Sequence, residues 1–466
     1  MKAVELKNVS FSYNGKEKVL DNVSFSANYG EITLVAGHSG EGKSTLLSII
    51  SGIIPNVTQG ELIGEVLVND EDIKGKKLGE ICRIVGMVLQ NADLQIVNDK
   101  VEDEIAFGPE NLAFNREKTK KQIDIVCNLL ELNKNDYTHT LSGGQKQRLI
   151  TASTLAMGQK ILILDEPLAN LDLDGARMLM ETCKALVQEG YAVIIVEHRL
   201  DVVLPYVDRV YHVGETRVEE VENKEEYLIS QTKKILDKTQ AFTGKAPLFT
   251  IKNVCYGVKN KEIIKNVSLT IYRGSRSVIL GENGCGKTTL LRLIAGLNKP
   301  TSGIITQEVD EKIKKPNKKW FKKVGVVYQN PDYQLFMPTV RKELEFGAES
   351  KEYAEEVAKL FSIEHLLDRH PQSLSEGQKR RVSIAAVVAT KPEVILLDEP
   401  TVGQDYKGLE EMVDIINKLH DETNISIITI THDVRCAVAL TDNAYVFNKG
   451  ELVKSGGKEL VDSYFN

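Results

Sequence analysis

The apolar positions of this chain form short runs separated by polar stretches. Residues 161–164 and Ala192–Val196 are continuous apolar runs, and Ile32–Ala36 and Ser426–Ile430 are of similar length and rich in β-branched residues. Runs of this kind are typical of strands that are buried on both faces of a parallel sheet. The pattern predicts strands at these four places, and none of the runs is long enough to cross a membrane.

Helical periodicity alternates with these strands. A glycine-rich loop follows Ile32–Ala36 and leads into a predicted helix at residues 43–51. A second helical region is predicted over residues 101–133, where four apolar residues recur at helical spacing: Ile123, Val126, Cys127 and Leu130. Strands that alternate with helices indicate an α/β fold, in which helices cover a parallel or mixed sheet.

The chain repeats its own sequence at long range. LKNVSFSYNGKEKVLDNVSF near the start returns as IKNVCYGVKNKEIIKNVSLT near residue 251, and ILILDEP returns as VILLDEP. The matching segments keep their order, at offsets of 233 to 245 residues. Solenoid repeats are only a few tens of residues long, so this spacing indicates two duplicated domains. We expect a first domain at residues 1–222, a helix and linker at 223–247, and a second domain at 248–466.

Composition narrows the class of protein. The chain has 466 residues, of which 42% are hydrophobic and 27% charged, and a formal net charge of −7. These values are typical of a soluble globular protein and give no bulk signal for nucleic acid or anionic lipid. The first residues, MKAVELKNVSFSY, lack the apolar core of a signal peptide. The six cysteines form no CxxC pair, so we expect buried free thiols rather than disulfides or a metal site.

Two segments match the pattern GxxxxGK[ST], each after a predicted strand and before a predicted helix. In such a loop the backbone N–H groups wrap phosphates, the lysine adds a positive charge and the hydroxyl ligates Mg²⁺. Glu41 is unusual there, because a carboxylate beside phosphates has to point away from them. The candidate phosphate-binding residues are Gly37, Ser39, Gly40, Gly42, Lys43, Ser44 and Thr45, and Gly281, Asn283, Gly284, Gly286, Lys287, Thr288 and Thr289.

An Asp-Glu pair ends an apolar strand behind each phosphate loop. Asp165 and Asp398 are placed to hold Mg²⁺, and Glu166 and Glu399 are placed to orient or deprotonate an attacking water. A histidine follows a further strand in each half, at His198 and His432. A lone histidine there is more often structural, but the duplicated placement favours a group that senses the γ-phosphate.

The segment LSGGQ precedes another predicted helix and is nearly repeated 233 residues later as LSEGQ. Bare backbone N–H groups and a serine at a helix start suit an anion, although an ordinary capped loop is the alternative. Glu376 replaces the first glycine of the pair in the second copy, so we expect two active sites of unequal rate. The candidate residues are Ser142, Gly143, Gly144 and Gln145, and Ser375, Gly377 and Gln378.

This ordered set of motifs resembles the ATPase domain of ATP-binding cassette (ABC) proteins, twice over nearly the whole chain. The resemblance implies tandem P-loop ATPase domains, each with a mixed sheet core, a helical subdomain and a small antiparallel β subdomain. It implies two ATP molecules with Mg²⁺, each held by the phosphate loop of one half and the signature of the other. It also implies that Gln90 and Gln329 contact Mg²⁺ and the attacking water. Asp172 and Asp405 match the loop that crosses between the halves. Tyr13 matches the aromatic residue that stacks on adenine, with Tyr256 as its counterpart.

A narrower resemblance follows from the residues around each glutamine. QNADLQIVNDKVEDEIAFGPENL and QNPDYQLFMPTVRKELEFG are similar to the ATPases of energy-coupling factor (ECF) transporters, which import vitamins or transition-metal ions. VEHRLD in the first half looks like the fused members of that family. This resemblance implies a transmembrane coupling subunit and a membrane substrate-binding subunit on separate chains, at the cytoplasmic face of the membrane, with no nucleic acid as partner. It leaves the cargo open.

Two other functions are compatible with tandem ABC domains. A soluble protein acting on ribosomes or nucleic acid usually carries a long charged helical linker, whereas the segment at residues 222–249 is short. A fused sugar-importer ATPase commonly has one degenerate site, whereas both halves here keep their Asp-Glu pair and histidine. A lysine cluster around Trp320 could be a nucleic-acid or lipid patch, but a solvated turn is favoured. It comprises Lys312, Lys314, Lys315, Lys318, Lys319, Lys322 and Lys323, with a weaker version at Lys74, Lys76 and Lys77.

Overall fold

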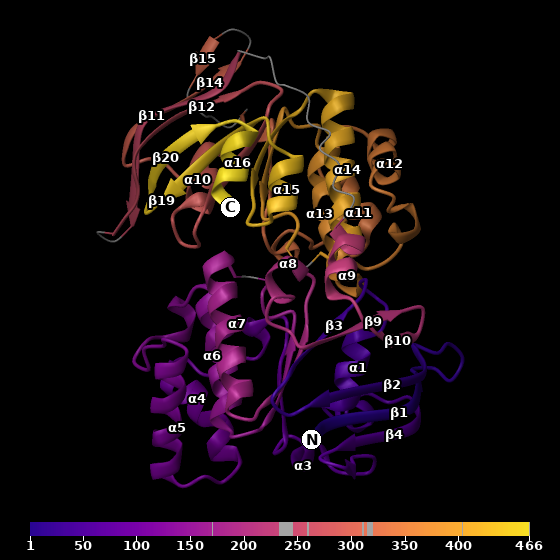
Figure 1. The fold of residues 1–466 in the computed structure, drawn as a ribbon. Coiled ribbons are helices and arrows are strands. Elements are labelled where there is room, and N and C mark those ends of the chain that lie inside the picture. Colours follow the sequence, from indigo (N-terminus) through magenta and orange to yellow (C-terminus); the bar gives the residue numbers. More distant parts are fainter. Residues whose placement is uncertain are drawn as a thin grey trace. The chain divides into compact units, whose positions relative to one another are not determined.

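The computed structural model divides into two compact units, Met1–Lys233 and Lys234–Asn466 (Figure 1). It describes residues 1–169, 171–232, 246–258, 261–309, 312–314, 320–402 and 404–465. Each unit contains a six-stranded sheet and a four-stranded antiparallel sheet. The predicted fold class, two tandem α/β domains built on mixed sheets, is confirmed.

The six-stranded sheet of the first unit has the order β10-β9-β3-β8-β7-β6 and is parallel except for β10. Its central strands are buried on both faces, as their apolar runs predicted. The carboxyl ends of these strands carry the residues of the candidate site. The strands are β3 (Ile32–Ala36), β6 (Val85–Val88), β7 (Ile161–Asp165), β8 (Ala192–Val196), β9 (Arg209–Gly214) and β10 (Arg217–Glu220).

The antiparallel sheet of the first unit has the order β2-β1-β4-β5. One continuous apolar core joins it to the six-stranded sheet through α1, which buries Leu46, Leu47, Ile49 and Ile50. Because each such side chain contributes about 1.5–3 kcal/mol on burial, this core fixes α1 and the loop before it. The strands are β1 (Lys2–Ser12), β2 (Leu20–Asn28), β4 (Glu61–Val68) and β5 (Glu71–Asp72), and the helices beside them are α1 (Lys43–Ile50), α2 (Ile53–Asn56) and α3 (Leu78–Ile81).

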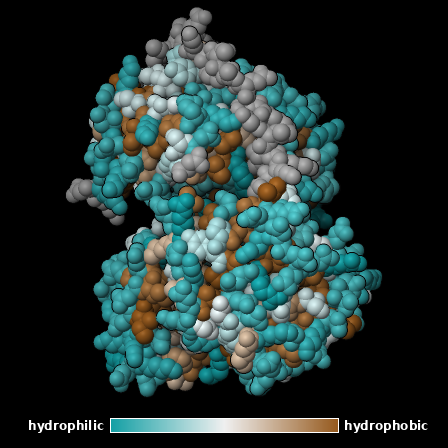
Figure 2. All heavy atoms as spheres, in the orientation of Figure 1, coloured by the Kyte–Doolittle hydropathy of each residue, from teal (hydrophilic) through white to brown (hydrophobic). Residues whose placement is uncertain are grey.

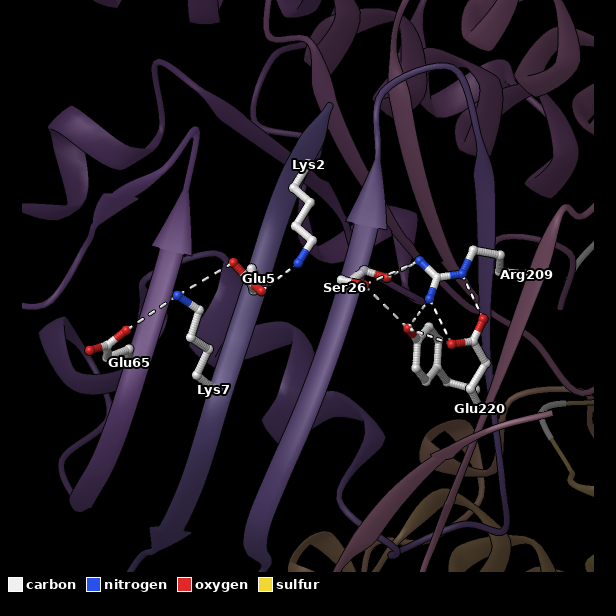
Figure 3. A network of polar contacts seen from close by, with 8 residues as sticks. Lys2, Glu5, Lys7, Ser26, Glu65, Arg209 and Glu220 are labelled. Carbon is white, nitrogen blue, oxygen red and sulfur yellow. Dashed lines mark hydrogen bonds and ion pairs between the residues drawn. The ribbon is translucent and has the colours of Figure 1, made fainter. Parts of the chain in front are cut away.

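Polar contacts add a second link between these two sheets (Figure 3). Arg209 of β9 donates from Nη1 to the backbone oxygen of Ser26 in β2 at 3.1 Å and forms an ion pair with Glu220 of β10 at 2.7 Å. Along β1, the ammonium of Lys7 lies 3.7 Å from Glu5 and 3.6 Å from Glu65 of β4. Exposed pairs of this kind contribute at most about 1 kcal/mol each, so the apolar core remains the main support.

The other face of the six-stranded sheet is covered by helices that share one apolar core with it. The helical region predicted over residues 101–133 is present and consists of two helices. The first ends at Asn111, Ala113 has φ +60°, and the Asn115 side chain caps the second by accepting the Lys118 N–H. The helices are α4 (Val101–Asn111), α5 (Arg116–Leu129), α6 (Gly143–Ala156), α7 (Leu173–Gln188) and α8 (Leu200–Val203).

Helix α9 (Lys224–Thr232) follows β10 and packs Tyr227 and Leu228 against the core of the first unit. The helix predicted from residue 223 to 238 is therefore present over part of its length, and the rest falls outside the described residues. The predicted linker at residues 239–247 also falls outside them, up to residue 245. The domain boundaries expected from the sequence stay a proposal.

The second unit repeats this plan, with sheets ordered β16-β17-β18-β13-β19-β20 and β12-β11-β14-β15. Its strands are β11 (Pro247–Val258), β12 (Lys261–Tyr272), β13 (Arg276–Gly281), β14 (Ser302–Val309), β15 (Lys312–Lys314), β16 (Val324–Val327), β17 (Val394–Asp398), β18 (Ser426–Ile430), β19 (Asn443–Asn448) and β20 (Glu451–Gly456). Its helices are α10 (Lys287–Ile294), α11 (Val340–Glu345), α12 (Lys351–Leu360), α13 (Glu376–Ala389), α14 (Tyr406–Thr423), α15 (Val434–Ala439) and α16 (Lys458–Phe465).

The face drawn in Figure 2 is largely polar, with brown apolar side chains lying among teal ones. Among the described residues, no helix is both long enough and apolar enough to span a bilayer. All six cysteines are free thiols. The expectation that they are buried is wrong for Cys82, which is exposed, and for Cys255, which is half-buried.

Candidate functional site

The backbone of each phosphate loop requires glycine. Gly37 has φ +148°, and a Cβ added there would lie 2.2 Å from the carbonyl oxygen of Val213 in β9. Gly281 has φ +149°, and a Cβ added there would lie 2.3 Å from the carbonyl oxygen of Phe447 in β19. A side chain at either position would collide with a strand, so only glycine lets the loop turn tightly from the strand end to the helix.

Each loop closes around its lysine. Lys43 donates from Nζ to the carbonyl oxygens of Gly37 at 2.9 Å and His38 at 2.7 Å. Lys287 makes the same pair of bonds, to Gly281 at 2.7 Å and Glu282 at 2.9 Å. Both lysines are buried. The ammonium groups are thus held inside the loops, where a phosphate oxygen can replace a carbonyl as their partner.

Glu41 turns back onto its own loop. Its Oε2 accepts the His38 N–H at 2.5 Å, and its carboxylate reaches toward Gly214 of β9. His212 of β9 lies beside it and shares a 2.8 Å hydrogen bond from Nδ1 with the hydroxyl of Tyr227. Burial lowers the pKa of His212, while the nearby Glu41 charge raises it in part. The loop of the first unit is therefore connected by polar groups to α9.

Hydroxyl and carboxylate oxygens converge next to each lysine. A hydrogen bond joins Ser44 to Asp165, and Thr288 donates to Oδ1 of Asp398 at 3.3 Å. Burial, with the Glu166 charge second, raises the pKa of Asp165 to about 6. Burial also raises the pKa of Asp398. Hard oxygen donors in this arrangement fit Mg²⁺, whose charge would favour the ionised carboxylates.

Glu166 and Glu399 follow the aspartates with strained backbones, at φ +47° and +50°. A left-handed conformation costs of order 1–3 kcal/mol and persists only where neighbouring groups hold it. In both units the backbone N–H of this glutamate donates to the carbonyl oxygen of the last residue of the adjacent strand. The acceptor is Val196 at 2.9 Å in the first unit and Ile430 at 3.0 Å in the second.

The two glutamates contact the predicted histidines. His198 Nε2 lies 3.1 Å from Oε1 of Glu166, and His432 Nε2 lies 3.2 Å from Oε1 of Glu399. Gln90 donates from Nε2 to the other oxygen of Glu166 at 2.7 Å. The structure thus brings Gln90, Glu166 and His198 together within the first unit, and it brings Glu399 and His432 together within the second.

Burial raises the pKa of Glu399 to about 7 from an ordinary value of 4.5. The pKa of Glu399 is higher in the folded than in the unfolded state, so protonation of this carboxylate stabilises the fold. The stabilisation is fully present below pH 4.5 and is lost as the pH rises through 7. We expect Glu399→Gln, in EDTA and without nucleotide, to stabilise the second unit at pH 8 by up to about 3 kcal/mol. Urea unfolding at pH 4.5 and pH 8 measures this. An equal change in unfolding free energy at both pH values would contradict the assignment.

Each signature serine caps a helix. The Ser142 hydroxyl accepts the Gln145 N–H at 3.3 Å while the Gln145 side chain accepts the Ser142 N–H at 2.9 Å, at the start of α6. At the start of α13 the Ser375 hydroxyl accepts the Gln378 N–H at 3.4 Å, and the Gln378 side chain accepts the Ser375 N–H at 3.2 Å. Glu376 points outward and pairs at 3.3 Å with Lys379. A carboxylate at this position is thus turned away from the first N–H groups of α13.

Other predicted residues are placed differently in the two units. Tyr13 is half-exposed, and its hydroxyl lies 2.9 Å from that of Thr45, whereas Tyr256 packs against the core of the second unit. Asp172 and Asp405 cap α7 and α14 by accepting the N–H groups of Gly175 and Gly408.

The lysine cluster is only partly described. Lys323 forms an ion pair with Glu393 at 2.5 Å, and Lys76 forms one with Glu71. These contacts agree with a solvated turn. Lys315, Lys318 and Lys319 lie outside the described residues, as do the side chains of Lys312, Lys314 and Lys322.

Sequence reasoning missed four charged residues beside the site. Glu104 and Glu343 are buried, and Arg380 donates to the backbone oxygens of Tyr328, at 3.2 Å, and of Gln329. Glu197 is buried between two loops. The repeat itself carried a signal for the first pair, because Glu104 and Glu343 occupy matching positions after the two glutamines.

Comparison with known proteins agrees with this geometry. The ABC transporter family model matches residues 20–169 and 264–402. A protein of Saccharolobus solfataricus, provisionally named an ABC transporter ATP-binding protein, is 34% identical over 99% of this chain and 95% of its own length. The Bacillus subtilis protein YkoD, provisionally named an HMP/thiamine import ATP-binding protein, is 33% identical over 97% of this chain and 91% of its own length.

A solved structure shares the fold of the whole chain. The structure of ribosome-bound archaeal Pelota and ABCE1 contains a chain that aligns with a TM-score of 0.71 and 23% identity, over 95% of this chain and 78% of that one. The present chain belongs to the ABC transporter ATPase family. It carries two fused ATPase domains of that family, whose members bind ATP with Mg²⁺ and hydrolyse it.

Proposed function

We propose that this chain is the ATP-hydrolysing motor of an ECF-type importer for a vitamin or a transition-metal ion. Its two domains couple ATP binding and hydrolysis to a separate transmembrane coupling subunit at the cytoplasmic face of the membrane, and a membrane substrate-binding subunit is a further partner. Binding of ATP closes the paired domains and hydrolysis reopens them. In this pairing, Ser142, Gly143, Gly144 and Gln145 serve the phosphate loop of Lys287, and Ser375, Gly377 and Gln378 serve that of Lys43.

The proposed chemistry uses the groups within each unit. Lys43 and Lys287 bind phosphate oxygens. Mg²⁺ would be held by Ser44, Gln90 and Asp165 or by Thr288, Gln329 and Asp398, and it would supply positive charge that offsets that of the phosphates. Water attacks the γ-phosphorus, and the bond to the bridging oxygen of ADP breaks. Glu166 or Glu399 takes the proton of the attacking water, while His198 or His432 holds the carboxylate in place.

The observation that carries the transport proposal is a pair of exposed apolar surfaces. Three large apolar side chains after Gln90 are 49–80% exposed, and three at matching positions after Gln329 are 57–79% exposed. We call these the post-glutamine surfaces. They comprise Leu94, Val97 and Phe107 in the first unit, and Tyr333, Phe336 and Phe346 in the second. Exposed apolar side chains repeated in both units indicate contact with other proteins.

Buried carboxylates fix the segments that carry these side chains. Glu104 of α4 accepts the N–H groups of Val97 at 3.0 Å and Asn98 at 2.7 Å. Glu343 of α11 accepts those of Phe336 and Met337 at the same distances, 3.0 and 2.7 Å. Because the segments are held in one conformation, less entropy is lost on docking. A rigid apolar surface beside the glutamine that contacts Glu166 suits a motor that transmits its state to a partner.

The similarity to YkoD supports this assignment, because it extends over almost the full length of both chains. Its name points to a thiamine precursor as one cargo, within the broader class of vitamins and transition-metal ions. The cargo contacts the membrane subunits in this proposal, so the residues of the ATPase do not select it.

The function is tested by affinity purification of the tagged chain from detergent-solubilised membranes of its source cells, followed by mass spectrometry. We expect small hydrophobic membrane proteins in near-stoichiometric amounts. Recovery with ribosomes that is lost at high salt would contradict the transport proposal and favour the soluble alternative.

The post-glutamine surfaces give a sharper form of this experiment. We expect the pair Tyr333→Asp and Phe336→Asp, and the pair Leu94→Asp and Val97→Asp, to reduce recovery of the membrane partner by at least about 30-fold, since buried anchors are worth roughly 2 kcal/mol or more each. Ile63→Asp and Ile304→Asp, at exposed apolar positions of β4 and β14, serve as controls and should leave recovery unchanged. Equal loss in the control variants would point to general destabilisation.

A further inference from the structure

Glu197, the residue before His198, lies between two loops of the first unit. It is only 3% exposed. Its Oε1 accepts the Leu168 N–H at 2.7 Å, and its Oε2 accepts the N–H groups of His198 at 2.8 Å and Arg199 at 3.2 Å. Three backbone donors compensate the burial of this carboxylate. One carboxylate thus joins the segment that carries the histidine to the segment that follows Glu166.

Arg199 strengthens the same connection from the other side. Its Nη1 donates to the carbonyl oxygen of Leu171 at 2.8 Å and to that of Leu168 at 3.4 Å. Glu197 and Arg199 together therefore bind both the N–H and the carbonyl group of Leu168. We call this pair and its contacts the Glu197–Arg199 clamp.

In the second unit, different residues connect the two corresponding segments. Thr431 and Asp433 stand where the first unit has Glu197 and Arg199, and Asp433 caps α15 and pairs with Arg435. There the Cys436 thiol forms hydrogen bonds with the side chains of Thr401 and Thr431. Thr401 matches Leu168, so this three-residue link joins the same two segments.

The clamp lies where backbone strain has to be held. Glu166 keeps φ at +47°, two residues before Leu168, and contacts His198 at 3.1 Å. A strained residue keeps its conformation only when its neighbours are fixed. The clamp fixes Leu168, which follows Glu166 in the chain, and His198, which contacts the Glu166 side chain. It therefore controls the geometry of the carboxylate that takes a proton from water in the proposed reaction.

We propose that Glu197 and Arg199 are positioning residues of the first ATPase site, and that Thr401, Thr431 and Cys436 are their counterparts in the second. The clamp acts through Glu166 and His198 rather than on ATP. This inference rests on the hydrolytic role of Glu166 proposed above, and it does not depend on the identity of any membrane partner.

The test is the steady-state rate of ATP hydrolysis by the full chain. We expect Glu197→Thr to lower kcat by roughly ten- to a hundred-fold, the size expected from a small misplacement of a catalytic group, while the KM for MgATP changes less than about two-fold. An unchanged kcat, or a rise in KM that accounts for the whole loss, would overturn the proposal.

A transplant separates positioning from folding. The combination Leu168→Thr, Glu197→Thr and Val202→Cys installs the link of the second unit, because Val202 matches Cys436. We expect it to restore kcat to within about three-fold of the original chain, whereas the same combination without Val202→Cys stays slow. Equal rates for these two variants would overturn the proposal even if Glu197→Thr alone fails to fold. If instead Glu166→Gln keeps full turnover, Glu166 is not the general base, and the clamp has no catalytic group to position.

Discussion

Glu166→Gln and Glu399→Gln are each expected to lower kcat for ATP hydrolysis by roughly 10²- to 10⁴-fold, the range for removal of a general base, because in the proposed cycle the paired domains reopen only after hydrolysis at both sites. Glutamine keeps the size and the hydrogen-bonding capacity of glutamate but cannot take a proton from water. Each carboxylate contacts the histidine of its own unit, at 3.1 Å for His198 and 3.2 Å for His432. The KM for MgATP should change little, because neither carboxylate is assigned to phosphate binding.

Release of inorganic phosphate at saturating MgATP measures this effect. Glu17→Gln and Glu262→Gln remove exposed carboxylates from the two units and serve as controls that should keep the original rate. A single variant, Glu166→Gln or Glu399→Gln, that retains full turnover would mean that its site is not catalytic. The two-site account would then be wrong.

Lys43→Met and Lys287→Met are expected to weaken nucleotide binding at their own loops by roughly 10- to 100-fold, since a hydrogen bond to a charged group is worth about 1.5–3 kcal/mol. Each ammonium is held by two loop carbonyl groups within 2.9 Å and is the positive charge inside its loop. Methionine fills nearly the same volume without charge. The loop carbonyls also lose their donor, so some loss of loop order contributes.

Titration with a non-hydrolysable ATP analogue and Mg²⁺ measures this binding. Each single variant should leave one strong site per chain, and the double variant none. Lys16→Met and Lys261→Met, at exposed positions, are matched controls. Two strong sites in either single loop variant would show that the lysine in question does not contribute to phosphate binding.

Local sequence signals predicted much of the fold. The strands at Ile32–Ala36, Ala192–Val196 and Ser426–Ile430 have the predicted bounds, because continuous apolar runs leave a buried parallel strand little room to shift. The break between α4 and α5 was missed, although Asn115 is a strong N-cap residue at the right place. The apolar spacing used for the prediction, from Ile123 to Leu130, lies within α5 and at its C-cap, so it carried no signal for the break.

The candidate site was read from motifs that occur in both halves, although the matching pair Glu104 and Glu343 was missed. Residues shared by both halves, such as Lys43 and Lys287, stood out because each appeared twice in the same order. The Glu197–Arg199 clamp has no copy in the second half, and it connects residues 28 to 31 positions apart in the sequence. No spacing rule links such residues, because their contact arises only when β7 and β8 pair side by side.

The two units also differ close to their signatures and phosphate loops. Glu376 was expected to disturb the second signature, yet it pairs with Lys379 and points outward. The larger differences lie at the phosphate loops, where the Glu41 carboxylate accepts the His38 N–H in the first unit and the buried Cys285 occupies the matching position in the second. We therefore expect any inequality in rate to follow the loops and the clamp rather than the signatures.

We propose that ATP hydrolysis by this chain is coupled to a membrane partner. The most direct measurement is the ATPase rate of the purified chain alone and of the same chain assembled with the co-purified membrane subunits in lipid nanodiscs. We predict a rate that changes several-fold on assembly, and that loses this response when Tyr333→Asp and Phe336→Asp are combined with Leu94→Asp and Val97→Asp. Identical rates with and without the membrane subunits would contradict the coupling.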